Sequence, residues 1–172
     1  MSVIETMKVY LGVEDENEIR SLLHDDHEQI LGLLKEICEA GTATKRTALF
    51  DALKPFLSAH ARAEEQVVYT RLLSTRSSED AKDLGNEGFV EHSLVDVLLA
   101  RLSKTTLAGT DAWKAHATVL KEILEHHIKE EEGEIFSVLG KEFSDEQRIA
   151  MGATFTLERN RLLTKKKVRK AA

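Results

Sequence analysis

Several features that are common in other proteins are scarce in this chain of 172 residues. Its one cysteine, Cys38, excludes an intramolecular disulfide and fits a reducing compartment. No stretch approaches about 18 consecutive apolar residues, and the N-terminus has no apolar run after a basic start, so we expect no membrane span and no signal peptide. The net charge of −6 gives no reason to expect nucleic acid as the main partner. These absences together predict a soluble cytoplasmic protein.

Proline is as rare as cysteine, because Pro55 is the only one. Charged residues make up 31% of the chain, above the usual quarter, and this composition suits long solvated helices. Runs rich in Leu, Glu, Lys and Ala point the same way. The sequence therefore predicts an all-α protein, and its length predicts a single domain over residues 1–172.

Apolar residues at three- and four-residue spacing predict four long helices, over about 16–40, 44–73, 79–103 and 111–139. The apolar pattern continues across Pro55, so we expect a kink or a late helix start there, and no chain reversal. Short loops join these helices, which favours an antiparallel up-down four-helix bundle with its core at about 17–140.

Short additional helices are expected at both ends of the chain. Capping-box patterns predict a leading helix at residues 3–11 and a terminal helix from about 144 to 163. The basic run from Lys165 to Lys170 is interpreted as a frayed, solvated terminus, with a weak contact to an anionic surface as the alternative.

The two halves of the chain repeat one pattern of histidine and glutamate. His60 is followed four residues later by Glu64, and His127 by Glu131, so each pair shares a helix face. His27 and His92 lie on the preceding helices. The surroundings match as well, with Glu65 and Glu132 one position after the paired glutamates, Tyr69 and Phe136 four positions further on, and Asp26 and Glu91 just before the first histidines.

Each half thus offers two imidazoles and one carboxylate. Two histidines plus one carboxylate, with open positions, form a ligand set suited to non-haem iron(II). In a bundle that brings the halves face to face, Glu64 and Glu131 could bridge two metal ions and neutralise charge that is costly to bury. The absence of cysteine ligands favours iron or manganese over structural zinc.

These residues resemble the hemerythrin-like family, also called the His-His-Glu (HHE) cation-binding domain. The similar segments are Asp26-His27, His60-Ala-Arg-Ala-Glu64-Glu65, Glu91-His92 and His127-Ile-Lys-Glu-Glu131-Glu132, within roughly residues 17–140. The resemblance implies an up-down four-helix bundle with two non-haem iron ions, bridged by carboxylates and often by an oxo or hydroxo group, with manganese or zinc as substitutes. It also implies that six residues of this chain are metal ligands: His27, His60, Glu64, His92, His127 and Glu131.

The pattern departs from that of the oxygen-carrying hemerythrins. Those proteins have a His-x-x-x-His pair on the third helix and, on the fourth, a histidine followed five residues later by aspartate. Here Asp96 stands four residues after His92, and the fourth helix supplies Glu131. The chain is therefore more similar to the broader family, which includes iron- and oxygen-responsive domains and proteins linked to nitric oxide or oxidative stress.

Other residues near the repeated positions leave alternatives open. His24, one turn before His27, and Asp96 are further candidates for ligands or for residues that orient them, against ordinary helix residues. Tyr69 is expected to be a core aromatic, with a redox role as the alternative. Asp26 and Glu91 could orient neighbouring groups, although the residue just before a core position usually points aside. The solvated side of the fourth helix is expected to hold His126, Glu130 and Glu132.

The leading functional hypothesis is a di-iron protein that binds, senses or reacts with O₂, peroxide or NO. The alternatives are an iron-responsive or storage module without turnover, and an enzyme that consumes peroxide or NO. The sequence assigns no catalytic residue and predicts a small diatomic or peroxide ligand as partner, with neither nucleic acid nor membrane.

Overall fold

The computed structural model of this protein describes residues 16–74 and 77–171. All regular secondary structure in these residues is helical, as expected. Within these ranges, no helix is long and apolar enough to cross a membrane. The leading helix predicted at residues 3–11 lies outside the described residues.

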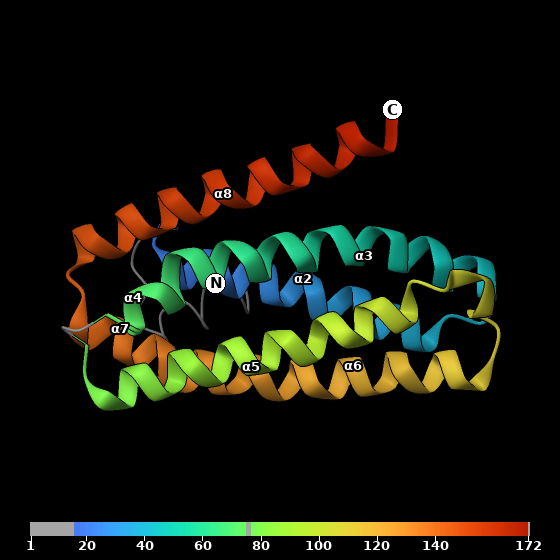
Figure 1. Cartoon of the computed structure of the whole chain (residues 1–172), viewed down its shortest axis with the longest axis horizontal. Helices are drawn as coiled ribbons and strands as arrows, with labels where there is room; N and C mark the ends of the chain where they lie inside the picture. The colour runs from blue at the N-terminus through green and yellow to red at the C-terminus, as the bar shows by residue number, and fades with distance from the viewer. Residues whose placement is uncertain (1–15, 75–76, 172) are drawn as a thin grey trace, which may run out of the picture.

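Four helices lie side by side: α2 (Ile19–Glu39), α3 (Ala43–Glu64), α5 (Glu79–Leu102) and α6 (Asp111–Glu130). Consecutive helices of this set run in opposite directions (Figure 1), an arrangement compatible with an antiparallel four-helix bundle. The α3, α5 and α6 helices begin after Thr42, Ser78 and Thr110, whose side-chain hydroxyls accept hydrogen bonds from backbone N–H groups of the first turn. These caps fix where each helix enters the structure.

The second and fourth predicted helices are interrupted at matching places. The α3 helix runs through Pro55 without a late start and then passes into a π-helical turn, η1 (Glu65–Tyr69), followed by α4 (Thr70–Leu72). The α6 helix passes into η3 (Glu131–Ile135) and then α7 (Phe136–Glu142). The sequence predicted unbroken helices here, because a π turn inserts one residue without interrupting the apolar pattern. Such turns are frequent at functional sites.

The terminal helix α8 (Asp145–Ala171) packs against α2 and α3 (Figure 1). It begins at the predicted capping box, where Ser144 and Gln147 each accept a hydrogen bond from the backbone N–H of the other. The prediction of a short helix ending near residue 163 is wrong, because α8 continues to Ala171 through the basic run expected to fray. Gly152 permits this packing, since a Cβ atom there would lie 2.0 Å from the backbone oxygen of Asn17.

The apolar core is divided into two clusters of buried side chains. One contains Leu34, Phe50, Leu99 and Trp113, and the other contains Ile19, Val67, Leu139 and Phe155. On each of the four long helices, the predicted histidines and glutamates fall between residues of the two clusters. A polar layer therefore crosses the interior between two apolar regions.

Candidate metal centre

The six residues predicted as ligands come together in this polar layer. All are at most 3% exposed. They come from four helices and one π turn, with His27 on α2, His60 and Glu64 on α3, His92 on α5, His127 on α6 and Glu131 at the start of η3.

The four imidazoles form two pairs. The rings of His27 and His60 have centroids 5.0 Å apart, and those of His92 and His127 are also 5.0 Å apart. Each pair joins the two helices of one half of the chain. The repeated pattern in the sequence is thus a repeated pattern in space.

Each buried carboxylate touches one histidine of each pair. The Oε2 atom of Glu64 lies 3.5 Å from Nε2 of His60 and 3.5 Å from Nε2 of His92. The Oε2 atom of Glu131 lies 3.3 Å from Nε2 of His27 and 3.6 Å from Nε2 of His127. Both glutamates therefore lie between the two histidine pairs, in the position that a bridging carboxylate requires.

A second layer of carboxylates holds the outer nitrogen of every imidazole. The Nδ1 atoms of His27, His60, His92 and His127 lie 2.9, 3.1, 3.1 and 2.6 Å from carboxylate oxygens of Glu132, Asp26, Glu65 and Glu91, respectively. An ionised carboxylate can only accept, so each Nδ1 carries a hydrogen, and a ring without a second proton presents an Nε2 lone pair to the centre. Metal-binding histidines are usually held in this way.

The inner atoms of this arrangement need a cation. Both carboxylate oxygens of Glu64 and both of Glu131 are buried without a hydrogen-bond donor, which is costly for charged groups. The Nε2 atoms of His92 and His127 lie 3.3 Å apart, and two lone pairs at that distance repel unless a proton or a metal ion lies between them. Ligand atoms of His92, His127 and Glu64 all lie within 4.8 Å of one another. The donor set therefore fits metal ions.

The pKa values of the two inner carboxylates move in opposite directions. Burial, together with the charge of Glu131, raises the pKa of Glu64 well above its usual value. Burial alone would also raise the pKa of Glu131, but the charges of His27 and His127 and other neighbouring interactions together outweigh it and lower that pKa. Without metal, the layer therefore holds a proton on one carboxyl beside a charged partner, and metal ions would displace that proton.

Three of the outer carboxylates decide points that the sequence interpretation had wrong or left open. Glu132, expected on the solvated side, has only 18% of its side chain exposed and accepts from both His24 and His27. Asp26 and Glu91 follow the alternative of an orienting role, because each reaches a histidine of the neighbouring helix. The signal was present in the sequence, since an acid precedes the first histidine and follows the paired glutamate in both halves.

The weaker candidates occupy different positions. His24 is buried beside the centre, donates from Nδ1 to Glu132, and has an Nε2 atom without a hydrogen-bond partner. Asp96 is separated from the centre, because its side chain is 52% exposed and pairs with Arg62 at 3.1 Å. Tyr69 is fully buried, its ring lies 5.3 Å from that of His92, and its hydroxyl has no hydrogen-bond partner.

The terminal helix contributes contacts that the sequence did not indicate. Phe155 is fully buried, and its ring meets that of His60 edge-to-face at a centroid distance of 5.7 Å. Arg159 pairs with Asp26, the carboxylate that holds Nδ1 of His60. Helix α8 therefore covers one side of the centre and helps to fix one of its histidines.

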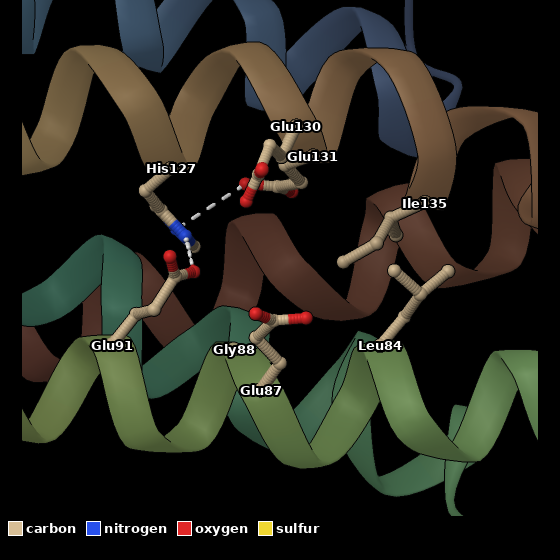
Figure 2. Close-up of a pocket in the computed structure, with 8 residues that line it drawn as sticks. All are labelled: Leu84, Glu87, Gly88, Glu91, His127, Glu130, Glu131 and Ile135. Carbon is tan, nitrogen blue, oxygen red and sulfur yellow. Dashed lines mark hydrogen bonds and ion pairs between the residues drawn. The ribbon is translucent and has the colours of Figure 1, made fainter.

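A narrow pocket leads from the surface to the centre between α5 and α6 (Figure 2). Its α5 side carries Glu87, Gly88 and Glu91, and the facing side carries His127 and Glu131. Its volume of about 20 Å³ is enough for one water molecule. His126 and Glu130, as expected, are exposed near this opening. A small ligand could enter by this route, whereas a large one could not.

Comparison with known proteins agrees with this geometry. The family model described as the hemerythrin HHE cation-binding domain matches residues 18–139. A protein from Nostoc sp. named DNA nickase is 25% identical over 144 residues, which cover 84% of this chain and 40% of that protein. The chain therefore spans less than half the length of this relative. No solved structure matches the chain significantly.

Proposed function

Because the chain belongs to the hemerythrin HHE cation-binding domain family, we propose that it holds two iron ions in an antiparallel four-helix bundle and binds, senses or reacts with O₂, peroxide or NO. Two iron ions, when bound, supply redox-active sites with positions open to such small ligands. The histidines His27, His60, His92 and His127 act as terminal ligands, and Glu64 and Glu131 as bridging ligands.

The position of the two glutamates carries the proposal. Glu64 and Glu131 each contact one histidine of both pairs and have no hydrogen-bond donor. A single ion at one histidine pair would leave the other pair without a cation. Two ions would give the carboxylates of Glu64 and Glu131 and the inner nitrogens of both histidine pairs a partner, which favours a dinuclear centre.

The surroundings of the centre support a small ligand. The pocket between α5 and α6 reaches Glu131 and His127 and admits a molecule of the size of water. The carboxylates at the Nδ1 atoms fix the rings, so the ligand exchanges without rearrangement of the histidines.

Metal analysis of the purified protein tests the ligand set. We expect two iron ions per chain, and a lower metal content in His60→Ala and His127→Ala. His126→Ala is a matched control, because this neighbouring histidine has 65% of its side chain exposed. Retention of two ions in both His60→Ala and His127→Ala would show that the ligand assignment is wrong.

Absorption spectra recorded from anaerobic to aerobic conditions separate the possible activities. A reversible change under O₂ supports a binding or sensing role, and steady loss of added peroxide supports an enzyme. Neither change, together with a large metal-dependent rise in melting temperature, supports an iron-responsive or storage module.

The relative from Nostoc suggests a second candidate, cleavage of one DNA strand. We rank it lower because that protein is more than twice as long as the matched region and the chain carries a net charge of −6, which opposes binding to a phosphate backbone. Incubation of the metal-loaded protein with supercoiled plasmid tests it, since nicking converts the plasmid to the relaxed form.

A further inference from the structure

The outer face of α5 carries an ordered stripe of exposed residues unrelated to the metal centre. Val90, Leu94 and Val97 are 61%, 51% and 57% exposed. Their alternating spacing of four and three residues places them on one line along the helix. Exposed apolar residues are ordinary when scattered, but a stripe at heptad spacing is typical of a helix that pairs with another helix.

The same line continues in both directions with charged residues of opposite sign. Asp83 and Glu87 precede Val90 at this spacing, and Arg101 and Lys104 follow Val97; all four are exposed. Within the described residues, none of these four charged side chains forms an ion pair. The stripe is therefore acidic at its beginning, apolar in its middle and basic at its end.

This order makes the stripe complementary to itself in the antiparallel direction. With a twofold axis at Leu94, Glu87 of one copy lies level with Arg101 of the other, and Val90 lies within one residue, about 1.5 Å, of the level of Val97. Glu87 and Arg101 are about 21 Å apart along a helix that rises about 1.5 Å per residue, so each end of the apolar segment is closed by an ion pair. A parallel arrangement would place like charges together.

The side of the stripe permits close approach. Asn86, Ser93 and Ala100 follow one flank at intervals of seven residues and are all exposed and small. Helix α5 is a regular α-helix throughout its length, without the π turns that interrupt its neighbours, so the stripe stays straight over this distance.

We infer that α5 is a self-association surface through which two copies of this chain form an antiparallel, twofold-symmetric dimer. The apolar segment supplies the attraction, and the terminal charges select a second copy in this one direction over other helices. Glu87 also lines the pocket that leads to the metal centre, so the dimer places Arg101 of the second copy beside the entrance.

Sedimentation of the full chain over a range of concentrations tests this inference. We expect a monomer–dimer equilibrium that Leu94→Glu abolishes. Leu157→Glu is the matched control, because Leu157 lies on α8 and is 71% exposed. If Leu157→Glu abolishes association and Leu94→Glu does not, the interface is on α8 and the inference is wrong.

Charge reversal tests the direction of pairing. Glu87→Lys alone and Arg101→Glu alone should each weaken the dimer about tenfold or more, because each places like charges together at both symmetric ends. The double variant should restore the association, with helicity by circular dichroism unchanged in all three. Failure of the double variant to recover would overturn the antiparallel arrangement.

A third measurement addresses the other possible occupant of this face. If the full chain stays monomeric at every concentration and a variant lacking residues 2–15 dimerises, the chain's own N-terminal segment covers the stripe and the inference is wrong. Dimerisation of the full chain, lost in Leu94→Glu, supports the second copy as the occupant.

Discussion

Glu132 provides the sharpest test of how the outer carboxylates act. One oxygen of this side chain lies 2.9 Å from Nδ1 of His24 and 2.9 Å from Nδ1 of His27. It therefore fixes two imidazoles of which one is a proposed ligand. We expect Glu132→Ala and Glu132→Gln to weaken metal binding without removing a ligand.

The size of the effect follows from the contacts that each substitution leaves. Loss of a carboxylate behind a metal-binding histidine typically costs about 10- to 100-fold in affinity, or about 1.4 to 2.7 kcal/mol. Glu132→Gln retains one acceptor oxygen but loses the charge, so we expect about tenfold. Glu132→Ala leaves both Nδ1 atoms without an acceptor, so we expect about 100-fold.

Competition with a chromophoric chelator under anaerobic conditions measures these affinities for iron(II). The matched control is Glu130→Gln, since Glu130 has 41% of its side chain exposed and pairs only with the exposed His126; an exposed pair of this kind contributes about 0–1 kcal/mol. Equal affinities for Glu132→Ala and Glu130→Gln, at unchanged helicity, would refute a positioning role for Glu132.

Three further predictions concern the stability of the protein. In the metal-free protein, burial would lower the pKa of His27, but the charge of the adjacent Glu131 and the hydrogen bond to Glu132 raise it from 6.5 to about 9. The stability from this raised pKa is fully present below pH 6.5 and is lost as the pH rises through about 9. The histidines lower the pKa of Glu132 from 4.5 to about 2 despite its burial, so its contribution is present above pH 4.5 and is lost as the pH falls through about 2. Thermal melts should give the highest melting temperature between pH 4.5 and 6.5, where both contributions are fully present. A melting temperature that rises from pH 6.5 to 9 would contradict this reasoning. Gly88→Ala should lower the free energy of unfolding by about 1–3 kcal/mol, because its Cβ would lie 2.6 Å from the Tyr69 ring. Gly32→Ala has nothing within 4 Å of its Cβ and should raise the free energy of unfolding by about 0.5–1 kcal/mol. Urea unfolding measures both, and equal effects would show that the Tyr69 contact is unimportant. Phe155→Ala should lower the free energy of unfolding by about 3–5 kcal/mol and weaken metal binding, because the His60 ring loses its contact. The control Leu157→Ala removes an exposed side chain and should change stability by less than about 0.5 kcal/mol. A Phe155→Ala protein that melts at the same temperature as Leu157→Ala would show that α8 does not support the centre.

The sequence was sufficient to predict the position of the inner residues. His60 with Glu64 and His127 with Glu131 share a helix face by spacing alone, and the repeat placed His27 and His92 on the adjoining helices. The capping box at Ser144 likewise identified the start of α8. These predictions succeed because they depend on local geometry.

Features that depend on packing between helices could not be predicted in this way. Glu132 follows a buried residue by one position, which suggests a different face, yet its side chain reaches His24 and His27 across the helix interface. The contact of Arg159 with Asp26 requires α8 to lie on α2. The π turns were missed because adjacent apolar residues such as Val67 and Val68 satisfy both α and π spacing.

The two π turns affect which changes in chain length the fold can tolerate during evolution. Each accommodates one residue more than an α-helical turn, and they begin directly after Glu64 and at Glu131. Deleting one residue from η1 would let the helix close as regular α and would leave the residues beyond it, buried Leu72 among them, close to their present orientation. A single-residue deletion is therefore better tolerated within η1 or η3 than in the regular α-helical segments, where it would rotate everything beyond it by about 100°. If the halves arose by duplication, the extra residue was already present in the ancestral half.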